Sequence, residues 1–358
     1  MKKKLAIVLA VAMMAGVIAG CGSKDNSGSA SSGGATSNGD AAATSDEEIT
    51  IKVGHGLPET MPIHQAWVKF QEDLAAKTDG RIKVEIYPNQ MLGGDRELIE
   101  ATQMGNIQAT SPSSTPYANF VPEYYLWDVP FLFENRDQVR EFFKNEEIAE
   151  AFNEKSLAIG IRIIGVCENG FRNVSRNGDG VTPDQYKGLK IRTMENDLHM
   201  AAWKAIGANP TPMAFGEVYT ALQQKTIDAQ ENPFGQIWDN KFYEVQDTII
   251  ETKHVYTPYI MMMNEAFFQS LSADDQKLIL DTMAEVCEYQ IDLSEEKEAE
   301  YRTNLEGQRT VSQLTDEQRA AFVAKIEEAD IKGMATEKSG NPELAEKFFA
   351  AVDAVTAK

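Results

Sequence analysis

The chain contains few of the residues that catalytic and metal sites most often use. Its 358 residues include only four histidines and three cysteines, and no two histidines have the spacing of a helical zinc pair. The sequence also lacks a Gly-x-Ser-x-Gly elbow, a Gly-rich loop ending in Lys-Ser/Thr, and a Gly-x-Gly-x-x-Gly turn. These absences argue against a serine hydrolase or a nucleotide-dependent enzyme, and they predict a protein without a metal or cofactor.

Positive charge is also scarce. The chain has 34 Lys and Arg residues against 55 Asp and Glu residues, which gives a formal net charge of -21. Such an excess of negative charge opposes binding to nucleic acid. It also gives a small anion no long-range attraction to the protein, so an organic acid must be held by cationic side chains close to it.

Long apolar runs are limited to the N-terminus. Three lysines precede the run Leu5–Ile18, which is shorter than the roughly 20 residues of a membrane span and suits a secretory signal peptide. The run ends in Ile-Ala-Gly-Cys, which resembles a bacterial lipobox, so Cys21 is predicted to be the lipidated first residue of the mature chain. We therefore predict a signal peptide over 1–20, a lipidated cysteine and flexible linker over 21–47, and a folded part at the outer face of the membrane.

The folded part, from about residue 48, is long enough to form two lobes. Its start alternates between strand and helix patterns, which predicts parallel strands covered by helices. The pattern comprises a strand at 51–53, helical spacing of Ile63, Trp67, Phe70 and Leu74, a strand at 82–86, and a helix after the turn at 93–95. Residues 274–308 contain no proline and predict a helix about 50 Å long that crosses both lobes. The predicted fold class is α/β, a two-lobed binding-protein fold with a cleft between the lobes.

The remaining pattern places further elements along the chain. The aromatic stretch 124–133 is predicted to be a buried crossing segment rather than a regular helix. Helices are expected at 136–152, 196–206, 215–225 and 238–245, strands at 159–167, 189–192, 255–263 and 311–314, and two helices at the C-terminus. We assign 48–169 plus 258–297 to lobe I and 170–257 plus 298–358 to lobe II. A cleft between two such lobes is the expected ligand site, with hinge closure around the ligand.

The most informative region runs from 168 to 233. Arg192 ends a predicted strand, where its side chain can point into a cleft. The planar guanidinium group fits a carboxylate through two parallel hydrogen bonds. Taken alone, a strand-end arginine more often forms a surface salt bridge.

The neighbouring motifs resemble those of a known family. They are Lys-Gly-Leu-Lys-Ile-Arg at 187–192, Gly-Ala-Asn-Pro-Thr-Pro-Met at 207–213, Glu-Val-Tyr-Thr-Ala-Leu-Gln at 217–223 and Gln-Glu-Asn-Pro at 230–233. Pro-Phe-Leu-Phe at 130–133 and the run at 241–245 match as well. This ordered set resembles the solute-binding proteins of TRAP (tripartite ATP-independent periplasmic) transporters, the dicarboxylate-binding DctP family. Ala229 departs from the glycine that often follows Asp in this family.

The resemblance implies a set of ligand-binding residues. Arg192 would pair with the ligand carboxylate, Arg172 would be a second ligand-facing arginine, and the Asn232 amide would hydrogen-bond the ligand. The remaining candidates are Phe215, whose ring would pack on the ligand, and His55, Glu97 and Ser113 or Ser114 on segments that complete the pocket. Phe215 could instead be core, Glu97 a charge favoured at a helix start, and His55 an ordinary loop residue.

The implied function is capture of a small organic acid and its delivery to the small and large membrane subunits of a TRAP transporter, by a monomer that is not an enzyme. A four-carbon dicarboxylate would use both arginines, whereas a sugar acid such as a uronate would use one. A sensor that presents its ligand to a membrane kinase, and a surface enzyme acting on sugar acids, remain alternatives. Cys167 and Cys287 are expected to be buried and unpaired, although a disulfide between them remains possible.

Overall fold

The computed structural model describes residues 47–357. The predicted signal peptide, the lipidated Cys21 and the linker lie outside the described residues. Within the described range, no helix combines the length and the apolar character that crossing a membrane requires.

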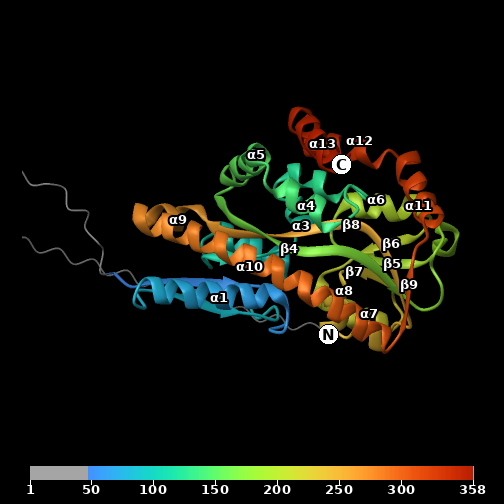
Figure 1. Cartoon of the computed structure of the whole chain (residues 1–358), viewed down its shortest axis with the longest axis horizontal. Coiled ribbons are helices and arrows are strands. Elements are labelled where there is room, and N and C mark those ends of the chain that lie inside the picture. Colours follow the sequence, from blue (N-terminus) through green and yellow to red (C-terminus); the bar gives the residue numbers. More distant parts are fainter. Residues whose placement is uncertain (1–46, 358) are drawn as a thin grey trace, which may run out of the picture. The chain divides into compact units, whose positions relative to one another are not determined.

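One mixed sheet of nine strands organises the described residues (Figure 1). Its centre is an antiparallel pair of long strands, β4 (Ile161–Arg176) and β8 (Thr248–Asn264). Beside β8 lie the group I strands, namely β3 (Ala109–Thr110), β1 (Ile49–Gly54) and β2 (Ile82–Tyr87). Beside β4 lie the group II strands, namely β7 (Ala229–Asn232), β5 (Lys190–Thr193) and β6 (Asn209–Pro212). β9 (Thr310–Gln313) pairs with β8.

The strands within each group are parallel, as the strand–helix alternation predicted. Three short strands, β3, β6 and β7, were not predicted. β6 contains Pro210 and Pro212 and lies at the edge of the sheet, where the missing backbone donors cost little. β7 reads Ala-Gln-Glu-Asn, a polar sequence that is nevertheless fully buried.

The helices surround this sheet. Before β5 they are α1 (Pro62–Lys77), α2 (Asp95–Gln103), α3 (Ser114–Tyr117), α4 (Arg136–Phe143) and α5 (Glu146–Leu157), with short 3-10 turns η1 (Pro122–Asp128) and η2 (Pro183–Tyr186). After β5 they are α6 (Asp197–Ile206), α7 (Val218–Gln223), α8 (Phe234–Asp239), α9 (Glu265–Ser270), α10 (Ala273–Glu306), α11 (Asp316–Glu328), α12 (Ile331–Ser339) and α13 (Pro342–Thr356), with 3-10 turns η3 (Phe215–Glu217) and η4 (Phe242–Glu244).

Three helix predictions were wrong in detail. The single helix expected at 136–152 is divided into α4 and α5, because the Asn145 side chain accepts a hydrogen bond from the Ile148 amide and begins a new helix. The helix expected at 238–245 ends as α8 at Asp239, and the left-handed backbone of Lys241 separates it from η4. The C-terminus has three helices instead of two, since the left-handed Asp330 and Gly340 flank α12.

The long helix was predicted correctly. α10 has 34 residues, about 51 Å at 1.5 Å per residue, and packs against α1 and β4 near its start and against α8 and β9 further along. Figure 1 shows it crossing the sheet beside β4. The aromatic stretch is buried as expected, with Tyr124 and Trp127 in the main core, although its first half forms the 3-10 turn η1.

This topology brings the carboxyl ends of both parallel groups together. The loops after β1, β2 and β3 and the loops after β5, β6 and β7 all contribute to one pocket beside β4 and β8. Ligands of open α/β sheets bind at such strand ends.

Candidate ligand-binding site

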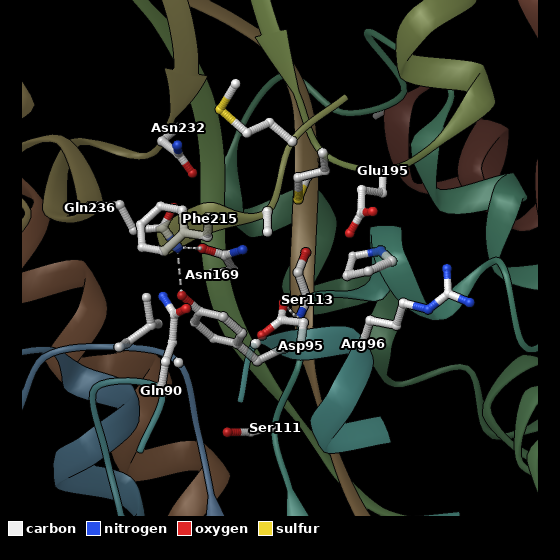
Figure 2. Close-up of a pocket in the computed structure, with 18 of the residues that line it drawn as sticks. Gln90, Asp95, Arg96, Ser111, Ser113, Asn169, Glu195, Phe215, Asn232 and Gln236 are labelled. Atoms are coloured by element: carbon white, nitrogen blue, oxygen red, sulfur yellow. Dashed lines mark hydrogen bonds between the residues drawn. The ribbon is translucent and has the colours of Figure 1, made fainter. Parts of the chain in front are cut away.

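One pocket is lined by polar and charged side chains from both groups of strands, and Figure 2 shows most of its lining. Group I loops, α2 and α3 contribute Gly56, Leu57, Gln90, Gly94, Asp95, Arg96, Glu97, Ser111, Ser113 and Pro116. The long strands contribute Asn169, Arg172 and Tyr259. Group II strands, loops and α8 contribute Arg192, Met194, Glu195, Met213, Ala214, Phe215, Asn232 and Gln236.

Arg192 is buried in this pocket and has an unused donor. Its side chain is 2% exposed, and Nε and Nη2 donate to the Met213 carbonyl at 3.0 and 2.7 Å. Nη1 has no hydrogen-bond partner among residues 47–357. Burial and the nearby Arg172 charge lower the pKa of Arg192 to about 10, so the guanidinium stays charged at neutral pH. A buried, charged donor without a partner is a site for an anion.

Arg172 is held differently, because a carboxylate already neutralises it. The side chain is 1% exposed, and it donates through Nε to Glu231 Oε2 at 2.5 Å and through Nη2 to Oε1 at 2.9 Å. Nη2 also donates to Asn232 Oδ1 at 3.0 Å. Arg172 lines the pocket, but its charge is compensated before any ligand arrives.

The surroundings of the Glu231 carboxylate keep it ionised. Burial alone would raise its pKa, but the Arg172 charge and hydrogen bonds from His254 and Arg172 hold the pKa well below its usual range. His254 Nε2 lies 3.1 Å from Glu231 Oε2, and burial lowers the pKa of His254. Glu231 is therefore an ionised carboxylate, with a neutral histidine beside it.

The structure places Asn232 and Phe215 at the pocket, each with a second role. Asn232 Nδ2 donates to Gln230 Oε1 at 2.5 Å, so both ends of its amide contact protein as well as facing the pocket. The Phe215 ring lies 5.9 Å from the Arg192 guanidinium and packs edge-on against Phe242 at 5.8 Å. Phe215 can thus both line the ligand pocket and pack against the hydrophobic core.

The first-lobe candidates divide into two kinds. Glu97 and Ser113 line the pocket; Glu97 accepts a hydrogen bond from the Gly94 amide at 3.0 Å, and Ser113 Oγ has no partner among the described residues. Ser114 is fully buried and His55 is 1% exposed, and neither is among the pocket-lining residues.

His55 instead fixes the loop behind the pocket. Its Nδ1 accepts a hydrogen bond from the Leu57 amide at 3.3 Å, and its Nε2 lies 3.0 Å from His64 Nδ1. Burial, and the adjacent His64, lower the pKa of His55 to about 3. A neutral His55 therefore holds Gly56 and Leu57 in place at the pocket wall, which is its structural role here.

Asp95 is a pocket residue that the motif comparison did not single out. It lies at the first position of α2, and its Oδ2 accepts a hydrogen bond from the Ser113 amide at 3.2 Å. Burial raises its pKa to about 6, against the opposing effects of the Ser113 amide and Arg192. Figure 2 shows Asp95 beside Ser113, across the pocket from Asn232. In the sequence, the Gly-Gly-Asp turn at 93–95 was the feature that could have indicated Asp95 as a pocket residue.

A chain of amides and one phenol completes the pocket. Gln236 Nε2 donates to Asn169 Oδ1 at 2.9 Å and to the Tyr259 hydroxyl at 2.7 Å, as the dashed lines in Figure 2 indicate. Gln236 Oε1 is buried without a partner among residues 47–357. These residues come from β4, α8 and β8 and share no local motif, so the sequence offered no signal that would group them.

The balance of charge in the lining is even. Three arginines, Arg96, Arg172 and Arg192, face three acids, Asp95, Glu97 and Glu195, and Arg172 also carries Glu231 behind it. The geometry therefore provides one buried cation with a free donor, together with several acceptors for hydroxyl groups.

Comparison with known proteins identifies the family. Residues 53–335 match the family described as bacterial extracellular solute-binding protein, family 7, or DctP. The chain belongs to this family.

Individual family members agree with this assignment. A solute-binding protein of Verminephrobacter eiseniae is 44% identical over 216 residues, which are 59% of this chain and 63% of that protein. The galactonate complex of the sugar acid binding protein of Advenella mimigardefordensis has a TM-score of 0.83 and 31% identity, covering 86% of this chain and 99% of the other. A TRAP solute-binding protein of Shewanella oneidensis with bound succinate has a TM-score of 0.80 and 29% identity, covering 85% and 99%.

These likenesses confirm the two-lobed α/β fold class and the TRAP solute-binding function that the motifs predicted. Members of the DctP family are extracytoplasmic transport proteins that bind small carboxylates. Both ligand classes left open by the sequence, sugar acids and four-carbon dicarboxylates, occur among the similar structures.

Proposed function

We propose that this protein captures a sugar acid with one carboxylate and presents it to the membrane subunits of a TRAP transporter. The observation that carries the proposal is the contrast between the two buried arginines. Arg192 keeps Nη1 without a partner among residues 47–357, whereas Arg172 is already paired with Glu231. One carboxylate therefore has a cation to bind, and a second one has none of equal strength.

Acceptor groups elsewhere in the lining support the same ligand class. Asp95, Gln236 Oε1 and Asn169 provide oxygen acceptors that suit hydroxyl groups. A second carboxylate placed there would face Asp95 and Glu97 and would be repelled. The site residues Arg192, Asn232, Phe215, Glu97 and Ser113 are thus proposed to contact the ligand, with Arg172 orienting the Asn232 amide.

A thermal-shift screen of aldonates, uronates and four-carbon dicarboxylates tests the proposal. A ligand present at 100 times its dissociation constant stabilises the protein by about 2.7 kcal/mol, which raises the melting temperature by several degrees. We expect the largest shifts with sugar acids. A screen in which only dicarboxylates stabilise the protein would overturn this assignment while leaving the family function intact.

Ionisation of Asp95 should make the affinity for a sugar acid depend on pH. Its pKa is about 6, so the carboxylate ionises as the pH rises through that value, while a sugar acid stays ionised throughout. We expect sugar-acid affinity, measured by calorimetry, to increase by about tenfold between about pH 5 and pH 7, because an ionised acceptor makes stronger hydrogen bonds. A dicarboxylate ligand should gain less over the same interval, because ionised Asp95 would repel its second carboxylate.

The control for this experiment is Asp95→Asn, which should remove the pH dependence. Calorimetry is preferred to melting temperature, because the raised pKa of Asp95 has the opposite effect on the unliganded protein. A carboxyl whose pKa is raised by folding favours the folded state below its unfolded pKa, and that contribution is lost as the pH rises through about 6.

The working cycle follows from the family and the strand geometry. We propose that a lipid anchor at Cys21 holds the monomer at the membrane and that the lobes are divided at 169/170 and 257/258. The register shift between Glu168 and Gly170 and the positive φ of 114° at Gly170 support a bend in β4 at that boundary. We propose that the protein does not change its ligand chemically. Instead, the pocket closes on the ligand and then releases it to the transporter.

A further inference from the structure

Two cysteines far apart in the sequence meet between the central strand β4 and the spanning helix α10. Cys167 and Cys287 are separated by 120 positions, and their Sγ atoms lie 3.2 Å apart. Both side chains are buried, with exposures of 0% and 7%. Figure 1 shows α10 passing beside β4, where this contact is made.

The neighbouring residues hold the two sulfur atoms in this position. Gln290 lies one turn after Cys287 and bonds both backbone groups of Glu168, accepting from its amide and donating to its carbonyl at 2.8 Å each. Gly165 allows the close approach, because a Cβ atom there would lie 2.6 Å from Cys287 Sγ. The thiols are thus kept in contact by the surrounding packing, at a separation only about 1 Å longer than an S–S bond of about 2.05 Å.

We propose that Cys167 and Cys287 form a disulfide bond that ties α10 to β4 in the exported protein. The family is extracytoplasmic, and disulfides persist in extracytoplasmic compartments that are oxidising. The oxidant is a protein disulfide of a thiol–disulfide oxidoreductase. The two cysteines lose two electrons and two protons, and the oxidant's disulfide is reduced to two thiols.

The geometry indicates the order of the steps. Cys287 lines an apolar pocket beside α4 and α5, whereas Cys167 is completely enclosed. Cys287 therefore forms the mixed disulfide with the oxidant, and Cys167 Sγ then attacks Cys287 Sγ and releases the oxidant's second thiol. Burial raises the pKa of the Cys167 thiol, so this attack occurs before α10 is fully packed on β4, while Cys287 at the apolar pocket is still accessible to the oxidant.

Disulfide mapping of the exported full-length protein is the direct test. The protein is denatured and alkylated without reductant, digested, and examined by mass spectrometry. We expect a linked pair of peptides containing Cys167 and Cys287, lighter by two hydrogen atoms than the sum of the free peptides. Quantitative alkylation of both cysteines would overturn the proposal.

A melting experiment measures the consequence. Closing a loop of this length restricts the unfolded chain. Wild-type protein that is unfolded, reduced and refolded in reductant should therefore melt about 5 °C or more below the oxidised protein. Cys287→Ala is the control and should melt at the same temperature with and without reductant. Equal melting temperatures for the oxidised protein and for protein that was unfolded, reduced and refolded would show that no such bond stabilises the fold. Because the cysteines do not line the ligand pocket, this result is independent of the ligand assignment.

Discussion

Arg192→Ala is expected to weaken ligand binding by roughly 2–5 kcal/mol, which corresponds to a loss of about 30-fold to several thousand-fold in affinity. The guanidinium is buried, stays charged at neutral pH and has an unpaired Nη1 within the described chain. Removing it leaves the ligand carboxylate desolvated and without its cation. Isothermal titration with the sugar acid that gives the largest thermal shift measures the loss.

Two control variants test whether the loss is specific to the guanidinium of Arg192. Arg192→Lys retains the charge but loses the planar fork, so it should also bind more weakly than the wild type. Lys190→Ala lies on the same strand, but its ammonium is at the surface near Asp228, 3.7 Å away. It should bind the ligand normally. Equal affinities for Arg192→Ala and the wild type would eliminate the carboxylate-binding role of Arg192.

Arg172→Met is expected to destabilise the unliganded protein by about 3–5 kcal/mol, because it leaves the Glu231 carboxylate buried without its cation. Both side chains are essentially inaccessible, with exposures of 1% and 0%. Urea unfolding followed by circular dichroism measures the free energy of unfolding. The double variant Arg172→Met/Glu231→Met should recover part of the loss, since it removes both charges together.

The pH dependence of stability should reverse in this variant. In the wild type the pKa of Glu231 is depressed, so its contribution is present above the unfolded value of about 4.3 and is lost as the pH falls through the folded pKa. Without Arg172, burial dominates and raises that pKa. Arg172→Met should therefore become more stable as the pH is lowered from neutral towards about 5. A variant with wild-type stability across this range would show that the ion pair is not what holds Glu231 in place.

Much of the fold was predictable because local patterns were consistent with the tertiary arrangement. The spacing of Trp67, Phe70 and Leu74 predicted the buried face of α1, and the proline-free stretch predicted α10. The failures occurred where a single polar or left-handed residue divides a helix, as at Asn145 and Lys241. They also occurred where tertiary pairing makes a strand from a polar sequence, as in β7.

The candidate site was predicted in part, through the motifs around the two arginines. Arg192, Arg172, Asn232, Phe215, Glu97 and Ser113 line the pocket, whereas Ser114 and His55 lie behind it. A one-residue difference along the chain separates a pocket-lining serine from a buried one, and only backbone direction decides between them. His55 is adjacent in sequence to the pocket residue Gly56 but points towards His64.

The sequence by itself determined the family and the α/β fold, and it singled out Arg192 as a candidate for binding a carboxylate. It could do so because ordered motifs and hydrophobic periodicity are local properties of the chain. Only the tertiary structure decided that, among residues 47–357, Arg192 retains a donor without a partner while Glu231 neutralises Arg172. The charge available to a ligand depends on which side chains the fold brings within a few ångströms. For the same reason, the proximity of Asp95 to Arg192 and of Cys167 to Cys287 became visible only in three dimensions.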